Sequence, residues 1–390
     1  MDPSCFSSAD VRIDANSLPL ASLLSFLQMK SSGRKLLSAL VCFFLAGGLR
    51  AAQDNKLSPL PAPVANNAVA IAYNDLGSRI FSFMGIGPRK TWDAITTSAY
   101  EMDPKNGKWK EKRPVPGTAG RLAATAVALG GQIFIFGGYV VDGQGVETTL
   151  SDVNVYIPYE DRYYRGKDIP VPVDDAVAGV YADRYIFLIG GWSKTEAVRN
   201  VQIYDTEKNL WIQADPVPGT PVFGHAGAIA GDTIVYVDGA YKNPDSKGPK
   251  YVASSECWMG KLPNPKTGDI TKIEWKKLPV HPGNAHYRIA AGTGPPVKKG
   301  GKIYFSGGTD NPYNYNGIGY NGQPSEPSPV TFAFDVKSEK WEIIDENTPD
   351  PTMDHRGLLV ANGELVMVGG MEKGQGVTAK VTVVKAKVRK

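Results

Sequence analysis

Side chains that can move protons or hold an anionic group recur at one kind of position, immediately before segments rich in small residues. Three of the four histidines of the chain, His225, His286 and His355, lie at such positions. Imidazole and carboxylate groups act as general acids and bases, and guanidinium groups hold carboxylates. The candidates for acid–base catalysis are His225, His355, Asp174 and Asp175, and the candidates for ligand binding at these positions are Arg121, His286, Tyr287, Arg288 and Arg356.

A second set of polar and aromatic side chains follows paired glycines or variants of that pair. It adds Trp192, Tyr241, Asp310 and Asn311 to the candidates for ligand binding. Residues 310–322 alternate tyrosine with asparagine, which suits carbohydrate, because aromatic rings stack on sugars and amides bond their hydroxyl groups. The alternatives for this segment are a surface loop held by its own turns and a calcium site built from aspartate and asparagine oxygens.

Sequence motifs for metal-dependent or nucleotide-dependent chemistry are absent. The chain has no His-Glu-x-x-His, no Cys-x-x-Cys and no glycine-rich phosphate loop that ends in Lys-Ser/Thr. It also has no Gly-x-Ser-x-Gly nucleophile motif. We therefore expect no metal and no cofactor, and hydrolysis by a serine triad or by zinc has no support.

The candidate positions recur because the chain is built from a repeated unit. An apolar segment that ends in Gly-Gly or a variant occurs six times, and a small-residue segment precedes it. Segments with an aromatic residue and then a tryptophan or tyrosine follow, for example Tyr204 and Trp211, and proline-rich links lead to the next copy. This pattern predicts many short strands joined by turns. The six apolar segments are residues 79–85, 132–138, 184–191, 233–239, 302–308 and 364–370.

This unit resembles the kelch repeat, and the resemblance covers nearly everything after residue 52. It implies an all-β fold, a six-bladed kelch β-propeller formed by residues 53–390, because four-stranded blades bury their faces only by packing around an axis. In such a propeller the links before the first strand and after the second strand surround the central channel on one face. The last copy lacks a fourth segment with a tryptophan. We predict that residues 53–62 supply it and close the ring as an N-terminal strand.

Residues 1–52 are predicted to be a leader rather than part of the propeller. A basic stretch (residues 30–35) precedes an apolar run (36–46), and small residues follow at 51–52. This is the pattern of a secretory signal peptide, and we expect translation to start at Met29. The apolar run is too short for a comfortable membrane span, so we expect a periplasmic or secreted product with no membrane span after signal removal.

Charge and cysteine content restrict the partners. The chain has 43 lysine and arginine residues against 39 aspartate and glutamate residues, and no long basic run, so we expect no nucleic-acid partner. The basic tail, residues 380–390, is interpreted as a solvated strand or frayed end. Cys257 is the one cysteine after the leader and can form no internal disulfide. We expect it to be a buried core residue, with a redox or metal role as the alternative.

At the level of an export signal and six kelch blades, the chain is similar to the bacterial N-acetylneuraminate epimerases, which are mutarotases. The resemblance implies a small-molecule ligand, a carbohydrate or sugar acid, and an acid and a base that open and close the sugar ring without a cofactor. One alternative is a non-catalytic protein- or glycan-interaction module. Another is a copper radical oxidase similar to galactose oxidase, a family that uses two histidines, two tyrosines and a cysteine cross-linked to one of the tyrosines. His286, Tyr287, His355 and Cys257 would supply some of these parts.

Overall fold

Short antiparallel strands make up the described part of the chain, as the repeat predicted. The computed structural model describes residues 57–384 apart from 75–76, 118 and 295–300. The predicted signal peptide and the start at Met29 lie outside the described residues. Among the described residues, no helix has the length and apolarity needed to cross a membrane.

Six sheets carry the fold, five with four strands and one with three described strands. Blade 1 consists of β1 (Ala68–Asn74), β2 (Gly77–Phe83), β3 (Ala99–Asp103) and β4 (Lys108–Lys112), and blade 2 of β5 (Thr125–Leu129), β6 (Gln132–Phe136), β9 (Val153–Ile157) and β10 (Arg162–Arg165). Blade 3 consists of β11 (Val177–Tyr181), β12 (Tyr185–Ile189), β15 (Val201–Asp205) and β16 (Leu210–Ala214), and blade 4 of β17 (Ala226–Ala230), β18 (Thr233–Val237), β21 (Cys257–Lys261) and β22 (Glu274–Leu278). Blade 5 consists of β23 (Ala290–Thr293), β24 (Lys302–Ser306), β25 (Thr331–Asp335) and β26 (Lys340–Asp345), and blade 6 of β27 (Leu359–Ala361), β28 (Glu364–Val368) and β31 (Val381–Val384).

Short hairpins and one helical turn lie within the links that follow the second strands. They are the hairpins β7 (Tyr139–Val141) with β8 (Glu147–Thr149), β13 (Trp192–Ser193) with β14 (Glu196–Ala197), β19 (Ala240–Lys242) with β20 (Tyr251–Ala253), and β29 (Met371–Glu372) with β30 (Gly376–Val377), and the 3-10 turn η1 (Trp92–Ala94).

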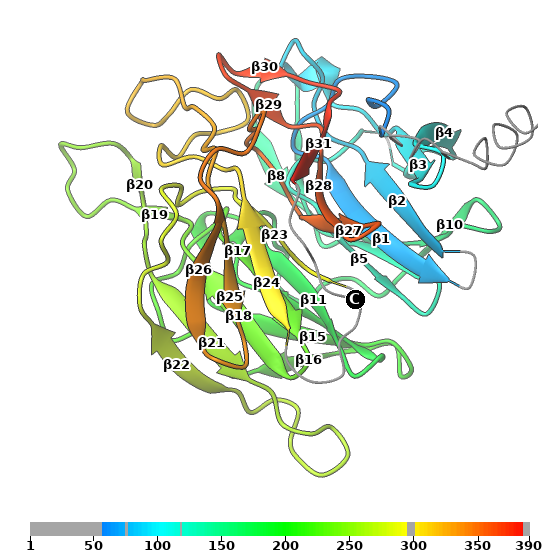
Figure 1. The fold of residues 1–390 in the computed structure, drawn as a ribbon, viewed down its shortest axis with the longest axis vertical. Helices are drawn as coiled ribbons and strands as arrows, with labels where there is room; N and C mark the ends of the chain where they lie inside the picture. Colours follow the sequence, from blue (N-terminus) through cyan, green and yellow to red (C-terminus); the bar gives the residue numbers. More distant parts are fainter. Residues whose placement is uncertain (1–56, 75–76, 118, 295–300, 385–390) are drawn as a thin grey trace, which may run out of the picture. The chain divides into compact units, whose positions relative to one another are not determined.

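The six blades close into a ring. Their first strands, β1, β5, β11, β17, β23 and β27, lie toward the middle in Figure 1 and contact one another in cyclic order, with β1 against β27. The second strands β2, β6, β12, β18, β24 and β28 coincide with the six apolar segments of the repeat. The prediction of an all-β, six-bladed propeller is therefore confirmed.

The turn after each second strand requires an unusual backbone. The first residue of the Gly-Gly pair, or of its variant, has positive φ in all six blades, including Met84 at 56° and Asp238 at 65°. A Cβ at Gly307 would lie 2.3 Å from the carbonyl oxygen of Thr352, in the link to the next blade. Glycine therefore suits this position for its conformation and for the close approach of the neighbouring blade.

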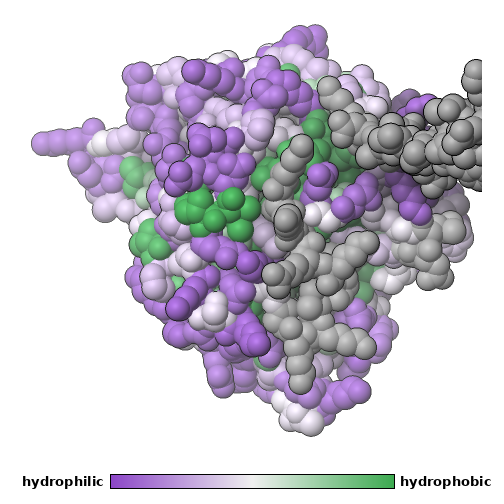
Figure 2. Space-filling model, viewed as in Figure 1, coloured by the Kyte–Doolittle hydropathy of each residue, from purple (hydrophilic) through white to green (hydrophobic). Residues whose placement is uncertain are grey.

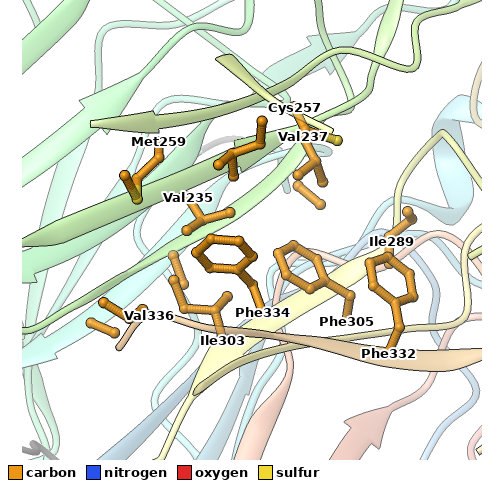
Figure 3. Close-up of a cluster of buried hydrophobic side chains, with 14 of the residues drawn as sticks. Val235, Val237, Cys257, Met259, Ile289, Ile303, Phe305, Phe332, Phe334 and Val336 are labelled. Carbon is orange, nitrogen blue, oxygen red and sulfur yellow. The ribbon is translucent and has the colours of Figure 1, made fainter. Parts of the chain in front are cut away.

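Apolar side chains fill the spaces between neighbouring blades. Figure 3 shows the cluster between blades 4 and 5, where Cys257 packs with Val237 near Phe305 and Phe332. The described surface seen in Figure 2 is mostly hydrophilic, with smaller separate hydrophobic patches. The apolar residues of the repeat thus serve mainly to join blades, as expected for a propeller.

The N-terminal segment of the propeller is attached to both the first and the last blade. The backbone N–H of Leu60 donates to the carbonyl of Ala379 at 2.7 Å, beside the last blade. The indole of Trp109 donates to the carbonyl of Ser58 at 2.9 Å, in the way that Trp211 and Trp341 each bond a carbonyl in the link just after the preceding blade. Ser58 thus occupies the position that follows a fourth strand. Residues 53–56 of the predicted segment 53–62 lie outside the described residues, and residues 57–62 are not part of a strand.

Candidate functional site

One residue from each blade forms a ring around the propeller axis, just before the first strands. All six have positive φ, and five are not glycine. Backbone hydrogen bonds join four neighbouring pairs, including Asp175 to Ala123 at 3.0 Å and Arg288 to Gly224 at 2.7 Å. Side chains join the other two pairs. The ring residues are Asn66, Ala123, Asp175, Gly224, Arg288 and Asp354.

Charged side chains of this ring, together with Arg356 of the last blade, pair with one another near the axis. Arg288 donates to Asp175 and to Asp354, each at 2.9 Å, and Arg356 forms an ion pair with Asp175 at an N–O distance of 2.7 Å. Arg356 also donates to the Asn66 amide oxygen at 2.9 Å. All four charged side chains are buried. Two guanidinium groups thus balance two carboxylates, and the structure brings the predicted residues Asp175, Arg288 and Arg356 together as a neutral buried cluster.

Burial and pairing act on these carboxylates in opposite directions. Burial raises the pKa of Asp175, but Arg288 and Arg356 outweigh it and hold that pKa below its usual range. For Asp354 burial is the stronger effect, and its pKa is raised despite the same two guanidinium groups. Breaking one of these pairs would leave an uncompensated buried charge, which is strongly destabilising.

A long link of blade 5 covers this cluster on the face that carries the links between blades, here called the loop face. This capping loop, residues 310–324, places the ring of Tyr313 5.0 Å from the Arg288 guanidinium, and the carbonyl of Asn314 accepts from Arg288 at 3.0 Å. It also reaches blades 1, 2 and 6: Lys90 donates to the Asn316 carbonyl at 2.8 Å, Asn314 donates to Glu147 at 2.8 Å, and Gly317 lies close to Gln375. Tyr313 and the predicted ligand-binding residue Tyr287 are fully buried.

A cavity of about 1490 Å³ follows the axis on the other side of the charged cluster. The first strands of the blades line it, and it extends to the hairpin turns of the opposite face, such as Gly130 and Gly131. Four residues predicted for catalysis or binding border its inner end: Asp175, His225, His355 and Arg356.

The two histidines at the inner end of the cavity are held in the neutral form. His225 Nε2 lies 3.0 Å from the carbonyl of Ile189, and because a carbonyl only accepts, this nitrogen carries the proton. His355 Nε2 bonds the Thr352 hydroxyl at 2.8 Å. Burial lowers the pKa of each histidine to about 4, and the neighbouring Arg356 adds to the effect at His355. Imidazoles with such a low pKa are weak bases at neutral pH.

Asp174 and Arg121 lie apart from the axial cluster. Asp174 accepts from the Thr149 hydroxyl at 2.7 Å, and burial, with the charge of Asp175, raises its pKa well above the usual range. Arg121 donates to Asn154 at 2.7 Å, and burial lowers the pKa of Arg121 to about 10, although Asp152 opposes this. Each of these two side chains is bonded within blade 2 or beside it.

The remaining predicted residues reach the surface on the loop face of blades 3 to 5. Trp192, Tyr241, His286 and Asn311 are partly exposed and Asp310 is exposed. Tyr251 joins two aromatic residues on this face, since its ring centroid lies 5.7 Å from that of Trp192 and 4.8 Å from that of Tyr320. This rim, formed by Trp192, Tyr241, His286, Asp310, Asn311 and Tyr320, is called the blade 3–5 rim below.

His286 belongs to a cluster that the sequence reasoning missed. Its Nδ1 lies 3.1 Å from one carboxylate oxygen of Asp238, and His281 Nε2 lies 2.7 Å from the other. The available signal was the fourth apolar segment, which ends in Asp-Gly instead of Gly-Gly. His281 had no signal of its own, because it lies in a proline-containing link rather than at the entrance of a strand.

Cys257 lies in the apolar cluster between blades 4 and 5 (Figure 3). Burial raises the pKa of its thiol to about 12, with the Asp238 charge as a further cause. The residues described for this cluster include phenylalanines and Trp341 but no tyrosine. The cysteine–tyrosine link that the oxidase resemblance implies therefore has no tyrosine partner within that cluster.

Comparisons with known proteins agree with the repeat. A family model described as "Kelch motif" matches residues 176–218, which span blade 3. Kelch-like protein 15 of Danio rerio is 23% identical over 243 residues, which cover 61% of this chain and 37% of that protein. An N-acetylneuraminate epimerase of Salmonella arizonae is 23% identical over 309 residues, which cover 68% of this chain and 73% of the epimerase.

A solved structure shares the fold over most of the chain. The structure of YjhT superposes with a TM-score of 0.66 at 18% identity and covers 86% of this chain and 98% of that one. The match to Kelch-like protein 15 spans little more than a third of that protein's length. The repeat, the closed ring of blades and the matched motif together show that the chain is a kelch-repeat six-bladed β-propeller.

Proposed function

We propose that this propeller is exported and binds a small polar ligand, a carbohydrate or sugar acid, on the blade 3–5 rim, where it interconverts anomers without a cofactor. The observation that carries the proposal is the contrast between axis and rim. The axial charges are paired and buried, whereas the rim leaves an imidazole, a carboxylate and aromatic rings partly exposed. Aromatic faces with a few polar groups suit a sugar ligand.

The similarity to an N-acetylneuraminate epimerase supports this ligand class, because it extends over 68% of this chain and 73% of the epimerase. Ring opening of a sugar requires a base for the anomeric hydroxyl proton and an acid for the ring oxygen. Water and an exposed imidazole can supply both roles. The export part of the proposal rests on the signal-peptide pattern in residues 30–52; cleavage near residue 52 in a secreting host, read by mass spectrometry, tests it.

The test combines a binding screen with an exchange assay. N-acetylneuraminate and common sugars are screened for a rise in melting temperature, and anomer exchange of each hit is followed by NMR. Trp192→Ala should weaken the melting shift, whereas Tyr159→Ala, which alters an 85% exposed residue of blade 2, should leave it unchanged. If the sugar raises the melting temperature of Trp192→Ala as much as that of the wild type, the ligand binds elsewhere. If no sugar raises the melting temperature and none shows accelerated exchange, the proposed function is refuted.

A second candidate function is the binding of a protein partner without turnover. It is favoured by an exposed apolar feature on blades 1 and 2: Trp92 is 52% exposed and lies beside Gly143, and Val146 in the same turn is 57% exposed. Exposed aromatic anchors of this kind mark interaction surfaces. Trp92→Ser should abolish capture of such a partner and leave any anomer exchange intact.

A further inference from the structure

Asp238 departs from the repeat at a position where a side chain is costly. In blades 2, 3, 5 and 6 a glycine stands there, and a Cβ on Gly137, Gly307 or Gly369 would lie 2.0–2.3 Å from a carbonyl of the next link; blade 1 has Met84, with a φ of 56°. In blade 4 the same place is taken by Asp238, with a φ of 65°. The neighbouring link, which carries His281 and His286, has to accommodate this side chain. Such local strain is a reason to look for a function.

The hydrogen bonds around Asp238 determine which nitrogen carries each proton. His281 Nδ1 accepts the backbone N–H of Gly283 at 3.0 Å, so the proton of neutral His281 lies on Nε2 and is donated to Asp238 at 2.7 Å. The other oxygen of Asp238 accepts from His286 Nδ1 at 3.1 Å. Neutral His286 therefore has its lone pair on Nε2.

A metal ion is the other ligand that this trio suggests, since its three donor atoms lie within 4.8 Å of one another. A metal needs an unprotonated nitrogen, and histidine ligands donate their other ring N–H to an acceptor. His281 has the opposite arrangement, because its unprotonated Nδ1 already faces the Gly283 N–H. The geometry therefore favours a hydrogen-bonded His–Asp–His relay over a metal site.

His286 is the member of the relay that meets solvent. Its side chain is 25% exposed, while those of Asp238 and His281 are fully buried. Its Nε2 has no hydrogen-bond partner among the described residues. The charged and titratable groups that face it are Asp238, Asp310 and the His281 ring, 5.1 Å away. The hydrogen bond to Asp238 raises the pKa of His286 above 6.5, although burial opposes this.

We propose that His286 is the general acid–base residue of this propeller, with Asp238 as its positioning residue and His281 holding Asp238 in place. The inference rests on the proposed function. His286 Nε2 takes the proton of the anomeric hydroxyl. The electrons of that O–H bond form the carbonyl as the bond between the anomeric carbon and the ring oxygen breaks. The ring oxygen keeps the electron pair of the broken carbon–oxygen bond and takes a proton from a water molecule, which becomes hydroxide. Closure on the other face of the carbonyl reverses each transfer, so protons and electrons balance.

The experiment measures anomer exchange from pH 5 to pH 9 in the full chain. His286→Gln should reduce exchange by about 10²–10⁴-fold, the usual contribution of a general acid–base group, while the melting shift by the sugar persists. Asp238→Asn should reduce exchange and move the apparent pKa of the pH profile downward, a change that a purely structural role would not produce. Tyr159→Ala is the control, since it alters an exposed residue of blade 2.

Each contrary outcome has a distinct meaning. A wild-type chain without exchange of any sugar refutes the proposed function and this inference with it. If the wild type is active and His286→Gln is equally active, this inference is wrong while the proposed function stands. The same holds if activity is lost in His225→Gln but not in His286→Gln. Zinc binding at one ion per chain that disappears in His281→Gln, with exchange abolished by a chelator, would replace the relay by a metal site. Without substrate, NMR of the His286 ring should show the proton of its neutral form on Nδ1; a proton on Nε2 would contradict the relay.

Discussion

Acidification should destabilise the propeller through two buried histidines, His225 and His355. Burial lowers the pKa of each from 6.5 to about 4. Each histidine has a lower pKa in the folded chain than in the unfolded chain. Its neutral imidazole therefore contributes to the free energy of unfolding above pH 6.5, and this contribution is lost as the pH falls toward 4. The unfolded chain binds a proton at each site through that window, and the folded chain does not.

The size of the effect follows from the pKa shift. One pKa unit corresponds to about 1.4 kcal/mol, so a histidine shifted from 6.5 to about 4 should account for about 2 kcal/mol of lost stability between pH 8 and pH 5. The loss would approach about 3 kcal/mol per histidine near pH 4. The carboxylates of the axial cluster titrate as well, so the contribution of one histidine must be isolated by comparing variants.

Denaturant unfolding of the wild type and of His225→Gln at pH 8 and pH 5 makes that comparison. Glutamine can still donate to the carbonyl of Ile189, which His225 bonds at 3.0 Å. The drop in unfolding free energy between the two pH values should be about 2 kcal/mol smaller in the variant. His286→Gln is a control of opposite sign, because the pKa of His286 is raised and its contribution grows on acidification. An equal drop in the wild type and His225→Gln would refute the assignment of a buried neutral imidazole.

Three further predictions concern closure, turns and the thiol. Removing residues 53–62 eliminates the Leu60 bond to Ala379 and should lower the melting temperature by several degrees; an unchanged melting temperature would contradict closure by this segment. Gly307→Ala puts a Cβ 2.3 Å from the Thr352 carbonyl and should cost at least about 1 kcal/mol in denaturant unfolding, whereas a neutral effect would show that the link yields. The Cys257 thiol, whose pKa burial raises to about 12, should react with a disulfide reagent only after unfolding, and prompt reaction at pH 8 would contradict its burial.

The fold could be predicted from the sequence because each blade repeats the same local requirements. The segment 302–308, for example, combines a short apolar strand with a Gly-Gly turn, and the structure has β24 (Lys302–Ser306) and positive φ at both glycines. The polar strand entrances were also found from the repeat. Such a repeat can be recognised in a single sequence because six blades pack in the same way and need similar residues at equivalent positions.

The use of those polar residues could not be predicted from the sequence. Whether Arg288 meets a ligand or a neighbouring blade depends on contacts with Asp175 and Asp354, which lie 113 and 66 residues away. The capping loop was recognised as distinctive, but its bond from Lys90 to the Asn316 carbonyl joins blades that are distant in sequence. No local pattern encodes such contacts. The Asp238 relay was visible only as the Asp-Gly that replaces Gly-Gly in the fourth copy of the repeat.

The division between axis and rim follows from the cost of burying charge. The ring position requires positive φ, which glycine adopts without strain, yet Asp175, Arg288 and Asp354 stand there. Their charges are compensated by one another and by Arg356, so binding an anion there would displace an existing carboxylate from its guanidinium partners. His286 has no such conflict, because Asp238 occupies Nδ1 and leaves Nε2 toward solvent. Under the proposed function, proton transfer to the sugar therefore disturbs the fewest existing contacts on the blade 3–5 rim, and the axial ion pairs are better explained as contacts that join the blades.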